Sequence, residues 1–227
     1  VTNLSECHQP LFKLIEEIAD KGKELARDMD GLNGWAIHHN ISIWREAYPS
    51  DGFVYWFFWN MSGPWLCNHI WEHYLFTKDV DFLKKYYPIL KGSATFCSEW
   101  LIENSKGELV TPVSTSPENA YLMPDDTPAS VCEGSTMDIA IIRSLFSNTI
   151  EASKILQTDR DFRSELIKKR SKLKGYQIGS KGQLLEWDKE YKESEPQHRH
   201  GSHLFGVYPG CDITDNTPEL FKAARKS

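Results

Sequence analysis

The sequence predicts a mainly α-helical protein whose helices form hairpins, with short β-strands in the loops between them. Apolar residues recur at the helical period over long segments, and polar loops separate these segments. The extended segments are short, and no internal self-similarity is strong enough to indicate a solenoid of repeats. We therefore expect paired helices with one set of loop ends facing a shared cleft.

The N-terminal half holds three of the expected helices, over residues 6–29, 64–77 and 79–102. Gly31 follows the first helix, as is typical of helix C-termini. A loop over residues 35–51 comes next and has no clean period. Pro88 and Gly92 predict a break or kink within the third helix. The short connection between the second and third helices indicates a helical hairpin.

The C-terminal half alternates between extended segments and helices. Residues 108–113 are expected to form a brief strand, and residues 120–135, which contain Pro124 and Pro128, a long irregular stretch. Further helices are expected over residues 136–156 and 161–173, short extended segments over 176–178 and 184–187, and the first turns of another helix over 217–227.

The composition is that of an ordinary globular protein, and the length allows one or two domains, of which we expect a single domain over residues 1–227. Hydrophobic residues make up 40% and charged residues 26% of the 227 residues. The net charge of −6 gives no field that would collect nucleic acid, and no apolar run is long enough to span a bilayer. We expect neither a nucleic-acid nor a membrane partner, and the sequence leaves the oligomeric state open.

The cellular compartment also stays open. The five cysteines lack metal-binding spacing and favour mostly reduced, buried thiols. No signal peptide is recognised, but N-x-S sequons begin at Asn3, Asn40 and Asn60, which would matter in a secretory pathway. Secreted, periplasmic and cytoplasmic locations all remain compatible with the sequence.

A stiff polar loop carries the strongest candidate for chemistry. Proline at positions 112 and 117 restricts the residue before it to extended conformations, so the segment Pro-Val-Ser-Thr-Ser-Pro-Glu-Asn is rigid and non-helical. Glu118 therefore has a fixed direction. Taken alone, the loop could equally be a solvated acidic turn.

Aromatic residues, at 12% with eight tryptophans, point to carbohydrate. Trp59 and Trp65 lie in a stretch dense in aromatic residues, and such rings present flat apolar faces to the C–H faces of sugars. At helical spacing, however, the same residues often belong to a core.

Three motifs together resemble glycoside hydrolase family 95. They are Trp-Glu-His-Tyr-Leu from residue 71, Ser-Thr-Ser-Pro-Glu-Asn from residue 114, and His-Arg-His-Gly-Ser-His-Leu from residue 198, the last followed by Tyr-Pro-Gly. Their order and spacing are similar to the family's over nearly the whole chain. The family contains α-L-fucosidases acting on α-1,2 linkages and some α-L-galactosidases.

The resemblance implies a catalytic domain built as an (α/α)6 toroid of helical hairpins, of which this chain would form the middle portion. It implies hydrolysis of terminal α-L-fucosyl residues of a fucosylated glycan with inversion, without a cofactor, and with Glu118 as general acid. The expected substrate-binding residues are His39, Asn40, Trp59, Trp65, Asn119, Arg199, His200 and His203.

Two departures from the family pattern bear on activity. His-His-Asn-Thr-Asp in the family is His-His-Asn-Ile-Ser here, from residue 38, so a hydroxyl replaces a carboxylate. The family's water-orienting asparagines and partnering aspartate would lie outside residues 1–227. An inverting glycosidase needs an acid and a water-activating group, so we expect the isolated chain to be incomplete.

Other chemistries have weaker support. His69 and His73 have a spacing that suits zinc, but neither HExxH nor a cysteine pair accompanies them, so no metal site is expected. No GxSxG elbow or glycine-rich phosphate loop is present. The remaining alternative is a non-catalytic carbohydrate-binding or structural α/α module, in which Glu118 only hydrogen-bonds a sugar or caps a loop.

Overall fold

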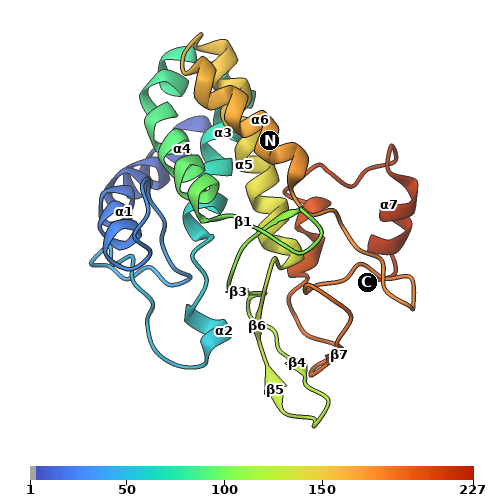
Figure 1. The fold of residues 1–227 in the computed structure, drawn as a ribbon. Coiled ribbons are helices and arrows are strands. Elements are labelled where there is room, and N and C mark those ends of the chain that lie inside the picture. The colour runs from blue at the N-terminus through green and yellow to red at the C-terminus, as the bar shows by residue number, and fades with distance from the viewer. Residues whose placement is uncertain (1–3) are drawn as a thin grey trace. The chain divides into compact units, whose positions relative to one another are not determined.

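Helices make up most of the regular structure of residues 4–227, the part of the chain that the computed structural model describes (Figure 1). Asn3, in the first sequon, lies outside it. The α-helices are α1 (Gln9–Asp28), α2 (Val54–Phe57), α3 (Ser62–Thr77), α4 (Val80–Trp100), α5 (Thr136–Ile155), α6 (Arg160–Lys172) and α7 (Pro218–Ala224). Two 3-10 helices cover Ser5–His8 and Ser202–Gly206.

The strands are two residues long and pair only antiparallel. They are β1 (Ile102–Glu103), β2 (Leu109–Val110), β3 (Ser114–Thr115), β4 (Tyr121–Leu122), β5 (Pro128–Ala129), β6 (Val131–Cys132) and β7 (Lys192–Glu193). β1 pairs with β2, β3 with β6, and β4 lies between β5 and β7. The expectation of a mainly helical chain with short strands in its loops is confirmed.

The described residues divide into two compact units. The first comprises residues 4–49, Asn60–Trp100 and Leu145–Ser171, and the second comprises Ser50–Trp59, Leu101–Ser144 and Lys172–Ser227. The chain passes from the second unit into the first within α5. That residues 1–227 form a single domain stays a prediction.

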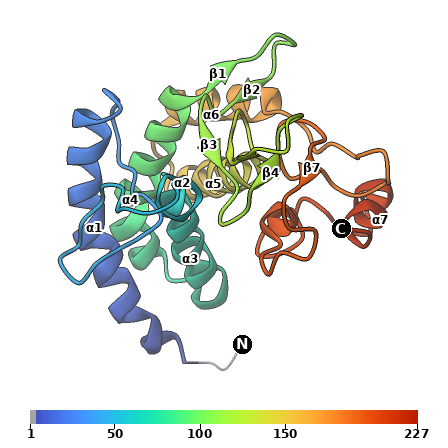
Figure 2. The ribbon, with the colours of Figure 1, turned by 90° about the horizontal axis from the view of Figure 1, so that it is seen from below.

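Helices α1, α3 and α4 form the core of the first unit and lie side by side in both views (Figure 2). Lys78, with φ 55°, ends α3 in the left-handed conformation, and the Asp79 carboxylate accepts the Phe82 N–H at 2.9 Å to begin α4. This connection confirms the expected hairpin. The second pair, α5 and α6, is held in this unit by Arg170, which donates to the Ser147 hydroxyl at 3.0 Å.

One tryptophan fixes how the first unit packs. Trp35 is 1% exposed, and its indole N–H donates to the Ile89 carbonyl of α4 at 2.8 Å. A Cβ added to Gly22 of α1, Gly63 of α3 or Gly92 of α4 would approach the indole ring to between 2.7 and 3.0 Å. Each of the three helices therefore contributes a glycine that makes room for the same ring.

The break expected in α4 is wrong, because the helix runs without interruption from Val80 to Trp100 with Pro88 inside it. Proline removes one backbone hydrogen bond, but buried residues on both sides of it, including Leu83 and Leu90, hold the helix against its neighbours. Gly92 is explained by close packing against Trp35 and not by a break.

The irregular stretch expected over residues 120–135 is also wrong. It contains β4, β5 and β6, with Asp125 Oδ1 accepting the Thr127 N–H at 3.0 Å in the turn between β4 and β5. Strands this short leave too few residues for an alternating pattern. The sequence likewise gave no indication of β7, of the short helix α2, or of the 3-10 helix Ser202–Gly206.

The remaining expectations agree with the structure to within a few residues at the helix ends, and all five cysteines are free thiols. Cys67, Cys97 and Cys132 are buried as expected, but the expectation is wrong for Cys7 and Cys211, which are exposed. Burial raises the pKa of the Cys67 thiol to about 12. Of the two sequon asparagines in the described chain, Asn60 is buried and Asn40 is exposed.

Two glycines with positive φ provide a test of this packing. Gly34 has φ +82°, and an added Cβ would lie 2.1 Å from the Gly92 carbonyl oxygen, whereas Gly31 has φ +68° and open space around it. We expect Gly31→Ala to lose about 1 kcal/mol for the left-handed backbone. Gly34→Ala should lose a further 1–3 kcal/mol or more from the backbone clash. Urea unfolding of both variants measures the difference, and equal losses would contradict the packing described for Gly34.

Candidate active site

The Glu118 loop is built on a buried row of hydroxyl residues. Ser114 and Thr115 form β3, Ser116 follows, and each of the three is no more than 1% exposed. The Asn119 N–H donates to the Ser116 carbonyl at 2.8 Å and closes a turn around Glu118. The Glu118 side chain is 25% exposed. The loop is thus anchored from below and presents one carboxylate at the surface of the unit.

The Glu118 carboxylate faces the segment that carries the His-Arg-His motif. The Arg199 guanidinium donates to Oε2 at 2.5 Å, and Nε2 of His200 lies 3.6 Å from the same oxygen. The side chains of Arg199 and His200 are 67% and 43% exposed. The two motifs that are far apart in the sequence therefore meet at Glu118.

A buried contact fixes the same segment to the Glu118 loop. The Ser202 hydroxyl donates to the Pro117 carbonyl, and Ser202 is 8% exposed. His203, the next residue, turns Nδ1 toward Oε2 of Glu186 at 3.5 Å and is 15% exposed on its side chain. Ser202 therefore holds the motif in place through the backbone of the loop.

Glu186 is a buried carboxylate beneath the loop. Its side chain is 9% exposed, and it accepts the Ser116 hydroxyl at 2.7 Å and the Asn119 side-chain amide at 3.1 Å. Its own backbone carbonyl accepts the N–H of Thr136 at the start of α5, at 3.0 Å. The expected substrate-binding residue Asn119 is itself 5% exposed and is held by this contact.

Asp138 is a second buried carboxylate, at the other end of the loop. It is fully buried and accepts the Trp59 indole N–H at 2.8 Å and the Thr111 hydroxyl at 3.1 Å. Burial raises the pKa of Asp138 to about 6, and hydrogen bonds from Ser114, Trp59 and neighbouring hydroxyls act in the opposite direction. Trp59 is 3% exposed, so its ring packs inside the unit.

The other expected binding residues, His39, Asn40 and Trp65, belong to the first unit. Asn40 is exposed, and His39 and Trp65 are half-buried. The loop that carries His39 is fixed at its base by Trp35, and the His38 N–H donates to the Ala47 carbonyl at 2.9 Å. In the second unit, the structure brings four of the expected residues together with Glu118: Asn119, Arg199, His200 and His203. The positions of His39, Asn40 and Trp65 are described only within the first unit.

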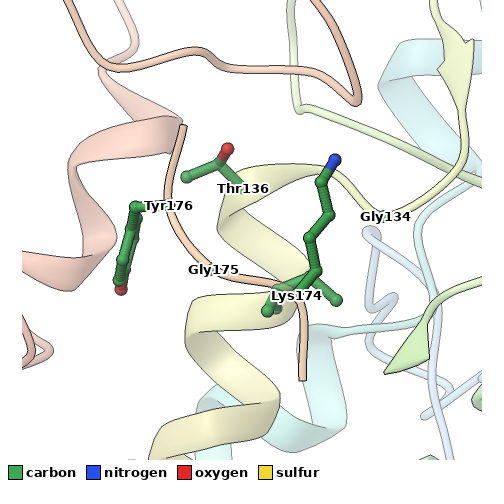
Figure 3. Close-up of a pocket in the computed structure, with 6 residues that line it drawn as sticks. Gly134, Thr136, Lys174, Gly175 and Tyr176 are labelled. Carbon is green, nitrogen blue, oxygen red and sulfur yellow. The ribbon is translucent and has the colours of Figure 1, made fainter. Parts of the chain in front are cut away.

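A cavity large enough for a sugar adjoins the site. Its volume is about 430 Å³, and its lining includes Asn119, Glu186, His198, His200, His203 and Leu204. A much smaller pocket of about 10 Å³ in the same unit, lined by Lys174, Tyr176 and residues at the start of α5, has room for about one water (Figure 3). Of these two, the larger has the volume for a carbohydrate and adjoins the Glu118 loop.

Among residues 4–227 there is neither a metal-binding cluster nor a membrane-spanning helix. Within that range no group of three or more His, Cys, Asp or Glu side chains is arranged to hold a metal ion. None of the described helices combines the length and the apolar character needed to cross a bilayer.

The sequence did not reveal three residues on which this geometry depends: Asp138, Glu186 and Ser202. Asp138 follows Ser135 by three positions, a spacing typical of a helix N-terminal cap, and Ser135 indeed accepts the Asp138 N–H at 3.2 Å. The sequence around Glu186 offered a clearer indication of burial than that around Asp138. An acidic residue flanked by Leu184, Leu185 and Trp187 is unusual for a solvent-exposed strand. Ser202 lies within the His-Arg-His-Gly-Ser-His-Leu motif, but nothing in the sequence indicated that its hydroxyl would donate to the Pro117 carbonyl.

Comparisons of the sequence with known proteins identify a family. The family described as glycosyl hydrolase family 95 catalytic domain matches residues 1–227. The chain is 42% identical over 224 residues to alpha-L-fucosidase 2 of Arabidopsis thaliana, covering 97% of this chain and 27% of that protein. It is 30% identical over 221 residues to the probable alpha-fucosidase A of Aspergillus niger, covering 94% of this chain and 27% of that protein.

The chain therefore belongs to the catalytic-domain family of glycoside hydrolase family 95. It spans about a quarter of the length of these two curated relatives.

The raised pKa of Asp138 predicts a pH dependence of stability. Because the folded protein binds this proton more tightly than the unfolded chain, whose carboxyl titrates near 3.8, the proton stabilises the fold at low pH. That contribution is lost as the pH rises through about 6. Asp138→Asn lacks this titration, so its stability relative to the unmutated protein should increase by about 3 kcal/mol between pH 3.5 and pH 7.

Chemical denaturation at several pH values measures this difference. Asp215→Asn, at an exposed position of the same unit, serves as the control and should show no such trend. A difference between Asp138→Asn and the unmutated protein that stays constant with pH would contradict the assignment.

Proposed function

We propose that this chain is part of an inverting α-L-fucosidase that cleaves terminal, α-1,2-linked fucosyl residues, with Glu118 as the general acid. The observation that carries the proposal is the turn around Glu118, which brings the carboxylate against Arg199 and His200 in a chain that matches a glycoside hydrolase family along its whole length. The names of the plant and fungal relatives support fucose as the sugar.

The geometry suits a proton donor. Glu118 is partly exposed, and the buried serines beneath it keep its direction. Glu118 does not itself line the cavity of about 430 Å³, but Asn119, the next residue, and His200, which faces its carboxylate, do. A general acid in this position donates its proton to the departing oxygen as the bond to the sugar breaks. The direction of the carboxyl matters because proton transfer requires hydrogen-bond distance to that oxygen.

Arg199 and His200 are suited to hold the sugar. Arg199 has five N–H donors, and its exposed side chain can turn from Glu118 toward sugar hydroxyls when a substrate arrives. His200 supplies a ring nitrogen that donates or accepts according to its tautomer. Asn119 and His203 are the other proposed binding residues of this unit, and His39, Asn40 and Trp65 are proposed binding residues within the first unit. Trp59, which the sequence also suggested, packs inside the second unit and has no exposed face for a sugar.

The water-activating half of the reaction lies elsewhere in the proposed protein. We infer an (α/α)6 toroid in which further helical hairpins bring a water-activating group to the opposite face of the sugar, about 6.5–9.5 Å from the acid as inverting enzymes require. Glu118 would then act only in a longer polypeptide. We call such a polypeptide, with this chain continued on both sides to the length of the plant relative, the extended polypeptide.

The first test is release of fucose from 2′-fucosyllactose by this chain and, in parallel, by the extended polypeptide. We expect release only from the extended polypeptide, because an inverting hydrolysis needs both groups. Release from neither, combined with a rise in melting temperature when the sugar is added, would favour the non-catalytic binding module instead.

The second test replaces the proposed acid. Glu118→Gln in the extended polypeptide should lower turnover of 2′-fucosyllactose by about 10²–10⁴-fold, because the amide cannot donate a proton, while the affinity for the sugar changes much less. Glu133→Gln, at an exposed position of the same unit and outside the cavity, is the matched control and should retain activity. Equal losses of turnover and affinity in Glu118→Gln would contradict the role as acid.

A further inference from the structure

Glu186 is a buried charged residue to which the proposed mechanism gives no role. It lies in the short segment between Leu184 and Trp187, and its side chain is only 9% exposed. A carboxylate is removed from water at a large cost unless hydrogen-bond donors replace the lost solvation. The identity of those donors therefore indicates what this side chain does.

The two hydrogen-bond donors to the Glu186 carboxylate lie before and after Glu118 in the sequence. Ser116, two positions before it, donates its hydroxyl to Oε1 at 2.7 Å, and Asn119, the next residue after it, donates its amide to Oε2 at 3.1 Å. One carboxylate thus holds the two ends of the turn whose middle carries the proposed acid. Rotation of either end would break a buried hydrogen bond.

The segment that carries Glu186 is itself fixed by hydrogen bonds and by packing. Thr136, the first residue of the 20-residue helix α5, donates its hydroxyl to the Leu185 carbonyl at 2.5 Å and its N–H to the Glu186 carbonyl at 3.0 Å. The neighbouring Trp187 packs in a buried cluster with Tyr121 and Cys132. The position of Glu186 is therefore set by a helix start and a small core, not by the loop that it holds.

We propose that Glu186 is a positioning residue that fixes the direction of the Glu118 carboxyl through Ser116 and Asn119. The inference rests on the proposed role of Glu118 as general acid. It assigns Glu186 to the proton-donation step, because its two hydrogen bonds, at 2.7 and 3.1 Å, go to the turn. Glu186 also lines the cavity and lies 3.5 Å from Nδ1 of His203, so the test below includes KM as the readout of a sugar-binding role. Removal of the carboxylate lets the turn move, and a displacement of about 1 Å at a reacting group costs on the order of 10²-fold in rate.

The test compares two substrates in the extended polypeptide. Glu186→Ala should lower kcat on 2′-fucosyllactose about 100-fold with little change in KM. On α-L-fucosyl fluoride the loss should be far smaller, because fluoride departs without a proton from the acid. A merely structural defect in Glu186→Ala would lower kcat on both substrates alike. A role of Glu186 in sugar binding would raise KM.

Two conservative variants make the comparison sharper. In Glu186→Gln the amide oxygen can accept from Asn119 while its NH₂ donates to the Ser116 hydroxyl, so most of the activity on 2′-fucosyllactose should return. Ser116→Ala removes one of the two hydrogen bonds and keeps the carboxylate, so it should show the same dependence on substrate to a smaller extent. Glu133→Ala, at an exposed position of the same unit, is the control.

Hydrogen exchange supplies a readout that does not depend on activity. The Asn119 N–H, which donates to the Ser116 carbonyl, should exchange faster in Glu186→Ala and at the normal rate in Glu186→Gln. Unchanged exchange in the alanine variant, or equal losses on the two substrates, would overturn the inference. If the unmutated extended polypeptide releases no fucose, the proposed function fails, while the exchange experiment still decides whether Glu186 holds the turn.

Discussion

The second unit depends on buried carboxylates that are solvated by neutral hydrogen-bond donors. Glu186 accepts from Ser116 and Asn119, and Asp138 accepts from Thr111 and Trp59. A buried anion without donors would be strongly destabilising, so each of these donors must keep its place for the others to be satisfied. The loop between residues 111 and 119 is held by one such carboxylate at each end. This mutual requirement explains how a segment with only two strand residues keeps a defined conformation.

The exposed part of the site follows from this buried frame. Glu118 is one-quarter exposed and Arg199 two-thirds exposed. Pro117, next to Glu118, and Ser202, three positions after Arg199, are buried and hydrogen-bonded to each other. Buried, hydrogen-bonded neighbours and exposed functional side chains thus lie within a few residues of each other. Such a site keeps the direction of its carboxyl while the arginine stays able to exchange partners.

The sequence was informative where a pattern extends over many residues or where a motif is distinctive. Long apolar periodicities gave α1, α3, α5 and α6 to within a few residues, and the Pro-Glu-Asn and His-Arg-His motifs proved to meet in space at Glu118. The interruption expected in α4 was wrong because local propensity gave way to tertiary packing around Pro88 and Gly92.

The short strands and the buried acidic residues could not be predicted from the sequence, because both depend on contacts between distant positions. Two paired residues leave no period to detect, and β4, β5 and β7 are defined by partners up to about 70 positions away. Whether an acid is buried or solvated depends on where its donors lie, and the donors of Glu186 are 67 and 70 positions from it. Such contacts become visible only when the chain is folded.

The ring of Trp35 and the three glycines around it form a single steric unit spread over four distant positions. At Gly63 and Gly92 the indole is what an added Cβ would meet, so a smaller residue at position 35 would leave space that alanine at those two positions could fill. Gly22 differs, because the Ala36 carbonyl oxygen would lie 2.6 Å from its Cβ whatever residue stands at position 35. Among related sequences, the size of the side chain at position 35 should therefore vary inversely with the size of the residues at positions 63 and 92, but not at position 22.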